Sequence, residues 1–167
     1  MRRVWPIVSR RAAIVTLCVL MLVAAIPRAA STQDNGGGNS MVVDGVLAYL
    51  GVLPAAMVRG HPESHSESGM HGGAPEGRHQ YHLVLALFDA QSGKRIESAQ
   101  VTVKIMGLGH VGATRLDLDP IAIANSITWG TYVKLPGSDV YDLTFEVKLP
   151  GRTAAIAVPF RYAHSNN

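Results

Sequence analysis

A chain of 167 residues with 47% hydrophobic and 16% charged residues has room for one domain of about 110 to 140 residues and enough apolar material for its core. This size excludes a large multidomain enzyme, and the sparse charge excludes a disordered, solvating chain. The net charge of +3 does not indicate nucleic-acid binding. Five of the fifteen basic residues lie in the first thirty positions and leave ten basic residues against twelve acidic ones.

The first thirty residues predict a cleaved secretory signal peptide. Arginines precede an apolar run at Ala12–Ile26, and small residues follow up to Ala30. The run is shorter than the roughly 20 residues that span a bilayer, and an uncleaved anchor is the alternative. Ser9-Arg10-Arg11 leaves both Sec and Tat export open. Because the only cysteine, Cys18, lies inside the run, we expect an exported, periplasmic protein without disulfides or thiolate ligands.

The predicted mature chain begins with a linker and an irregular strand. Residues 31–40 are rich in glycine and predict a flexible linker, and residues 41–167 form the predicted domain. Met41–Val58 is apolar but interrupted by glycines and a proline, which favours an irregular first strand over a helix. The segment 59–79 is polar and rich in Gly, Ser and Pro, so it is predicted to be a loop.

From Tyr81 onward the hydrophobic residues recur at every second position. Tyr81–Ala90 is apolar on both faces and predicts a central strand. Further half-buried strands are predicted at 101–106, 141–148 and 154–162. Turn sequences occur at 90–94, 135–139 and 149–152. Asp119–Asn125 is predicted to form one short helical turn. This pattern predicts an all-β fold, an antiparallel immunoglobulin-like β-sandwich of about seven strands, with a barrel as the alternative.

Histidines are concentrated in one part of the chain. Five of the seven lie within the twenty-two positions from His61 to His82, where an even spread would place about one. Imidazole is the commonest metal ligand, and a neighbouring thioether selects for copper(I). We therefore predict a site for a copper ion, with iron, manganese or zinc as alternatives. The candidate ligands are His61, His65, Met70, His71, His79 and His82.

The candidate ligands differ in how else they can be explained. His65, Met70 and His71 lie in the predicted loop, where packing gives no reason for them, so they are the strongest candidates. His82 lies inside the predicted central strand, where a buried histidine bonded to a backbone carbonyl is an equal alternative. His79 and His82 are three positions apart and face opposite ways on a regular strand, so they share an ion only across a bulge or at the strand entry. For the whole cluster the alternative is a solvated loop that binds no metal.

The sequence does not indicate catalysis. Asp117 and Asp119 are typical of a solvated loop, and no second acidic pair suggests a glycosidase. No nucleophile-elbow pattern is present, and His110 lies in a glycine-rich turn that lacks the lysine of a phosphate loop. We therefore expect a protein that is not an enzyme.

Two stretches resemble a known family. Tyr81–Arg95 and Thr128–Gly151 are similar to the immunoglobulin-like periplasmic proteins that accompany bacterial iron permeases, the Fe2+ transport protein family, and to YtkA-like and copper-resistance sandwich domains. The second stretch has an aromatic-Gly step, a Pro-Gly turn, Tyr-hydrophobic-Thr alternation and a closing proline. The resemblance implies a β-sandwich that binds copper, iron or manganese through His and Met, commonly as a homodimer.

The chain departs from this family at its ligand positions. The metal-binding histidine before the aromatic-Gly step is replaced by Thr128, and Trp129 stands where the family has Tyr. The family methionine that follows a proline is replaced by Ile121. Any metal site is therefore expected to draw on residues 61–82.

These observations lead to one functional hypothesis and two alternatives. The chain is predicted to be a periplasmic metal-binding protein that captures, carries or delivers copper, in the manner of a metallochaperone. Its expected partners are the metal ion and a membrane permease, an oxidase or another metallochaperone, with no nucleic acid. The alternatives are a noncatalytic periplasmic interaction module of the same fold and an iron-permease accessory protein.

Overall fold

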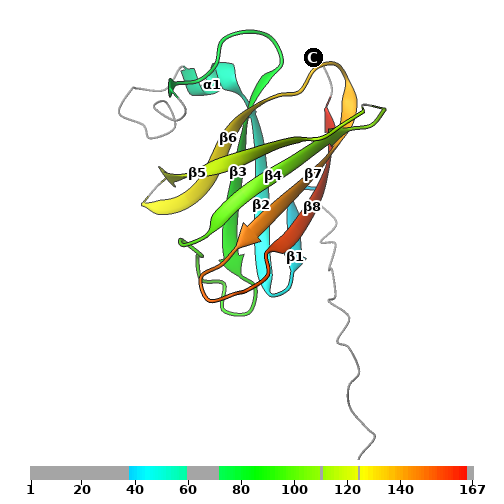
Figure 1. Cartoon of the computed structure of the whole chain (residues 1–167). Coiled ribbons are helices and arrows are strands. Elements are labelled where there is room, and N and C mark those ends of the chain that lie inside the picture. Colours follow the sequence, from blue (N-terminus) through cyan, green and yellow to red (C-terminus); the bar gives the residue numbers. More distant parts are fainter. Residues whose placement is uncertain (1–37, 60–71, 110, 124, 165–167) are drawn as a thin grey trace, which may run out of the picture.

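The computed structural model describes residues 38–59, 72–109, 111–123 and 125–164 (Figure 1). Its elements are β1 (Ser40–Val43), β2 (Val46–Pro54), α1 (Ala55–Arg59), β3 (Gln80–Asp89), β4 (Gln100–Gly107), β5 (Thr114–Ile123), β6 (Ser126–Lys134), β7 (Asp139–Lys148) and β8 (Ile156–His164). The predicted all-β antiparallel fold is confirmed, with eight strands in place of about seven. In the described ranges, no helix has the length and apolar character needed to cross a bilayer.

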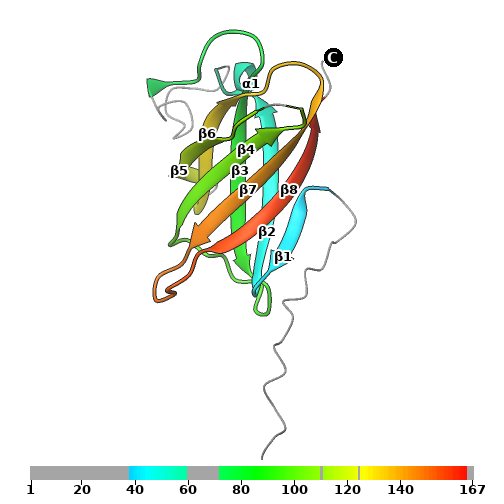
Figure 2. The same cartoon turned by 45° about the vertical axis from the view of Figure 1, so that its right-hand side comes forward.

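All eight strands belong to one sheet that folds over on itself. The strand order is β1-β2-β3-β6-β5-β4-β7-β8. The fold occurs within β5, whose residues Thr114–Leu118 pair with β4 and whose residues Asp119–Ile123 pair with β6. The two outer strands, β1 and β8, come to lie beside each other (Figure 2). The result is a nearly closed sandwich in which β1, β2, β3 and β6 form a first layer and β4, β7 and β8 form a second layer.

Side chains at alternating strand positions fill the space between the two layers. On β3 the inward-facing residues Leu83, Leu85 and Leu87 are fully buried. Phe145 on β7 and Phe160 on β8 meet edge to face, with ring centroids 5.8 Å apart, and Trp129 on β6 is another of the largest fully buried side chains. Burial of each such side chain contributes about 1.5–3 kcal/mol, so this alternation dictates which face of every strand points inward.

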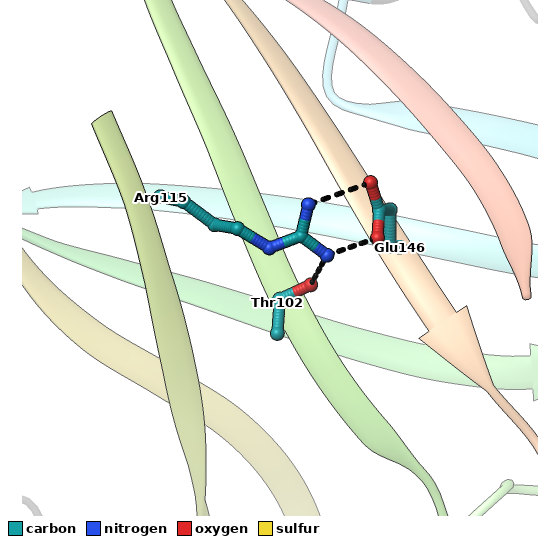
Figure 3. Close-up of polar contacts among 3 residues, drawn as sticks. All are labelled: Thr102, Arg115 and Glu146. Atoms are coloured by element: carbon teal, nitrogen blue, oxygen red, sulfur yellow. Dashed lines mark hydrogen bonds and ion pairs between the residues drawn. The ribbon is translucent and has the colours of Figure 1, made fainter. Parts of the chain in front are cut away.

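The outer face of the second layer and the adjoining half of β5 carries paired charges. Arg115 on β5 donates hydrogen bonds to both carboxylate oxygens of Glu146 on β7, and to the Thr102 hydroxyl on β4 at 3.2 Å (Figure 3). Arg161 donates to Asp142 at 3.1 Å on the neighbouring strand pair. The side chains of these ion pairs are 36–69% exposed, so this face is solvated and its charges neutralise one another.

Two sequence predictions are corrected by the structure. Met41–Val58 is not one irregular strand. A two-residue turn at Asp44-Gly45, both with positive φ (48° and 80°), divides it into β1 and β2, and α1 follows. Asp119–Asn125 does not form a helical turn, because residues up to Ile123 continue β5 and pair with β6. The predicted linker at 31–40 also reaches into β1, which begins at Ser40.

Candidate functional site

His82 is a fully buried histidine on β3. It alternates with the core leucines of that strand and therefore points to the outer face of the first layer. There its ring packs against Tyr132, its register partner on β6, with ring centroids 4.9 Å apart and the planes tilted by 34°. Helix α1 packs on β2 and β3 and buries Ala55 and Val58. The outer face is thus covered at this end of the sandwich, which explains how an outward-pointing imidazole is excluded from solvent.

Gly130 makes the space that the imidazole of His82 occupies. A Cβ atom at this position on β6 would lie 2.6 Å from His82 Nε2 and 3.1 Å from Ile121 Cδ1. No side chain other than hydrogen fits at that distance without a shift of its neighbours. The aromatic-Gly step recognised in the sequence therefore has a local steric reason.

The two positions at which the chain departs from the ligands of the resembled family lie together, and Ile121 borders the space at Gly130 that His82 occupies. Ile121 and Thr128 are register partners on β5 and β6, and both are buried. In this chain they supply an aliphatic group and a hydroxyl instead of a thioether and an imidazole. The Thr128 hydroxyl also accepts a hydrogen bond of 2.6 Å from Arg95 Nη2. A fixed guanidinium disfavours a metal cation at this spot, so of these three positions only His82 offers a ligand.

His79 marks the point at which the chain enters β3. Its φ of 64° lies in the left-handed region, and its carbonyl accepts a hydrogen bond of 2.9 Å from the Leu135 amide. The backbone therefore bends just before the strand. His79 and His82 could share an ion only if the chain departed from a regular strand between them. Among the described residues, no three His, Cys, Asp or Glu side chains converge as a metal centre. The described residues therefore do not complete a metal site around His79 and His82.

The remaining predicted ligands, His61, His65, Met70 and His71, lie outside the described residues. The ends of the segment that carries them are defined, because Pro54 and Tyr81 form the last register pair between β2 and β3 and Leu53 pairs with His82. Residues 55–79 are therefore the connection of a β2–β3 hairpin, and the two strand ends that it joins flank the Leu53–His82 register pair. The Arg59 guanidinium, at the end of α1, donates to the Pro75 carbonyl and ties the two arms of the connection together.

The fold is similar to that of several proteins of known structure. A copper-bound variant of FetP from uropathogenic Escherichia coli strain F11 superposes with a TM-score of 0.58 at 12% identity, covering 78% of this chain and 96% of that one. A copper-bound variant of P19 from Campylobacter jejuni gives 0.59 at 12% identity, covering 77% and 94%. A DUF4426 family protein from Pseudomonas aeruginosa PAO1 gives 0.56 at 12% identity, covering 75% and 96%. No family model and no curated protein matches the sequence.

The likeness to FetP and P19 concerns the fold alone, because only about one residue in eight is identical. It nevertheless covers nearly the full length of both proteins, so the two-layered sandwich is common to all three.

His164 is a buried histidine that the sequence analysis did not single out. It is 5% exposed at the end of β8, and its Nε2 lies 3.1 Å from the hydroxyl of Tyr81 on β3. The Tyr162 ring stacks on it with centroids 6.0 Å apart. The contact joins the two layers at the end of the barrel. The inward alternation of β8 could have indicated it, since His164 continues the row of Ile156, Val158 and Phe160.

Proposed function

We propose that this protein binds a transition-metal ion in the periplasm, with copper as the leading candidate. The ligands would come from the β2–β3 connection and from His82. The observation that carries the proposal is the hairpin register. It makes the histidine-rich segment the connection that begins and ends beside a buried imidazole. Ligands that are far apart in a loop can meet one from the scaffold when the loop leaves and returns at that point.

The chemistry of the available donors supports copper. The candidate set contains imidazoles and the thioether of Met70, a combination that suits copper(I). FetP and P19, on the same fold, are copper-bound. In this chain Ile121 and the Arg95-bonded Thr128 offer no comparable donors, so the site draws on residues 61–82. Iron, manganese and zinc are the competing ions.

The proposed role is capture and delivery of the ion without turnover. A signal peptide over the first thirty residues would bring the mature chain to the periplasm, where a permease, an oxidase or a metallochaperone would exchange the ion with it. Ligands carried on a connection, in place of ligands fixed within strands, allow stepwise exchange with such a partner. The fold likeness and the resemblance of Tyr81–Arg95 to iron-permease accessory proteins support this setting.

The test is a titration of the mature protein with Cu(I) in competition with a chromogenic chelator. We expect a dissociation constant tighter than about 1 μM, and a loss of affinity of at least tenfold, roughly 1.4 kcal/mol, in a His65→Ala/His71→Ala variant. His82→Asn should weaken binding in the same direction. The matched control is His110→Ala, which removes a histidine outside the cluster and should leave the affinity unchanged.

Two outcomes would reject the metal proposal. The first is a dissociation constant weaker than about 1 μM for Cu(I), Cu(II), Zn(II), Fe(II) and Mn(II) alike. The second is an affinity that the His65→Ala/His71→Ala variant and His110→Ala change equally. Parallel titrations with the five ions also decide which metal the site prefers.

A further inference from the structure

The outer face of the first layer is apolar, in contrast to that of the second layer. Its positions follow from the register, in which outward-pointing residues of β1, β2 and β3 stand opposite one another. They include Val42, Leu47, Tyr49, Val84, Ala86 and Phe88. Tyr49 is 47% exposed, Leu53 on the same face of β2 is 39% exposed, and Met57 on the adjoining helix α1 is 57% exposed. The register places these apolar side chains on neighbouring positions of three strands, and an apolar face of this kind indicates a contact surface.

Arg95 places a positive charge, fixed by hydrogen bonds, on this apolar face. Its guanidinium carbon lies 4.8 Å from the centre of the Phe88 ring. The Tyr49 ring packs edge to face against the same Phe88 ring, with ring centroids 5.7 Å apart. Arg95 Nε donates to the Ile127 carbonyl at 3.2 Å and Nη2 donates to Thr128 at 2.6 Å. Among the described residues, Arg95 forms no ion pair with a carboxylate, whereas Arg115 and Arg161 of the other face do.

The geometry of Arg95 suits a carboxylate from outside the chain. The contacts to Ile127 and Thr128 fix the guanidinium plane, so little side-chain entropy remains to be lost on binding. Nη1 is not used in these contacts and can donate to an acceptor that arrives from solvent. The Phe88 ring below and the hydroxyl of Thr128 beside it restrict the approach to the outer side of the face.

We propose that this face docks a partner protein that presents a carboxylate surrounded by apolar side chains. Arg95 would receive the carboxylate, and Tyr49, Leu53 and Met57 would receive the apolar groups. Hydrogen-bonded ion pairs among apolar contacts that exclude water are typical of the residues that dominate interface energies.

Two other occupants of the face are outcomes of the test. A second copy of the chain would present its own carboxylates, of which Asp89 already accepts hydrogen bonds from the Ser92 amide and hydroxyl and Glu97 accepts one from the Ile127 amide at 3.4 Å. A membrane surface attracts proteins through clusters of several lysines and arginines. The described face instead offers Arg95 among apolar side chains and has no cluster of several lysines and arginines.

The test uses the full-length chain in the envelope of its source cells, with a photoreactive phenylalanine analogue in place of Tyr49. The matched control carries the analogue in place of Lys104, on the solvated face of the second layer. We expect a protein adduct at position 49 alone, with the cross-linked partner peptide containing an Asp or Glu. Arg95→Glu should remove the adduct, and changing that partner carboxylate to arginine should restore it in the Arg95→Glu background.

A second variant keeps the test decisive if Arg95→Glu fails to fold. Leu53→Ser changes an exposed side chain on the same face and should also reduce the adduct, with folding of both variants checked by circular dichroism. The proposal is overturned if position 49 gives no more adduct than position 104, or if the adduct is a dimer of the chain or a lipid. It is also overturned if folded variants leave the adduct unchanged, or if the cross-linked peptide contains no carboxylate.

Discussion

On the outer face of the first layer, the imidazole of His82 fills the space that a side chain at Gly130 would need. A methyl group on Gly130 would lie 2.6 Å from the imidazole Nε2, with Ile121 Cδ1 at 3.1 Å and the Leu83 carbonyl oxygen at 3.3 Å on its other sides. The Leu83 oxygen belongs to the backbone, and the side chains of His82 and Ile121 are buried, with exposed fractions of 0% and 3%, so these neighbours have little room to move away. The imidazole therefore keeps its place only because residue 130 has no side chain.

Gly130→Ala should consequently destabilise the fold and displace the imidazole. Overpacking at a buried position costs about 1–3 kcal/mol, and urea denaturation would measure the loss. The control is Gly51→Ala on β2, where the added methyl would lie 3.6 Å from Val84 Cβ, an ordinary contact. There the smaller entropy of the unfolded chain should stabilise the protein by about 0.4–1 kcal/mol. Equal effects of the two substitutions would contradict the steric role of Gly130.

Much of the fold follows from hydrophobic periodicity. The two-residue alternation identifies β3, β4, β7 and β8, because each has one inward row of apolar residues. The β1–β2 hairpin was not predicted, although Asp44-Gly45 is the dipeptide that a tight hairpin turn prefers. The C-terminal half of β5 could not be predicted from local preferences, since Pro120 disfavours a strand and the pairing with β6 overrides it.

The site is less predictable than the fold because it depends on cross-strand neighbours. The burial of His82 was one of the two readings weighed for it. The contact between Arg95 and Thr128, which are 33 positions apart, exists only through the placement of the segment after β3 against β6. The space at Gly130 depends on β3, β5 and β6 at once. The predicted ligands His61, His65, Met70 and His71 lie outside the described residues and stay predictions.

Placing metal-ligating side chains at Ile121 and Thr128, where the chain departs from the resembled family, should create metal affinity within the strands. Ile121→Met with Thr128→His places a thioether and an imidazole at paired positions of β5 and β6, and β6 is the strand next to that of His82. Arg95→Ala removes the cation that bonds to residue 128. In a His65→Ala/His71→Ala background, this triple change should tighten Cu(I) binding at least about tenfold. Competition titration against the same background gives the comparison. Ile121→Met with Thr128→His alone, with Arg95 retained, should bring a smaller gain, because the guanidinium repels the ion.

The Tyr81–His164 contact should contribute measurably to stability. Tyr81→Phe removes the hydroxyl that lies 3.1 Å from His164 Nε2 and keeps the ring. Since a hydrogen bond of this kind contributes about 0.5–1.5 kcal/mol, we expect a loss of that size in the free energy of unfolding. Tyr49→Phe, at a side chain 47% exposed, is the matched control and should change the stability by less than about 0.5 kcal/mol. A Tyr81→Phe variant as stable as the control would show that the contact adds nothing.

Two tyrosines should make the fold less stable at alkaline pH. Burial, together with the charge of Asp139, raises the pKa of Tyr141, and burial, with a smaller effect of Tyr81, raises the pKa of Tyr162. An unfolded tyrosine titrates near pH 10. Above that pH the unfolded chain therefore loses phenolic protons that the folded chain retains, and the free energy of unfolding falls as the pH rises.

The measurement is the urea midpoint from pH 8 to 11. Tyr141→Phe or Tyr162→Phe should each flatten the alkaline decline, since a phenylalanine has no proton to lose. Tyr141→Phe also removes the hydrogen bond of 2.6 Å to the Pro136 carbonyl, so its midpoint at pH 8 should be lower while its slope is smaller. Phe145→Leu is the control, because it lowers stability without removing a phenol and should keep the wild-type slope. An alkaline decline that stays the same in both tyrosine variants would show that other groups cause it.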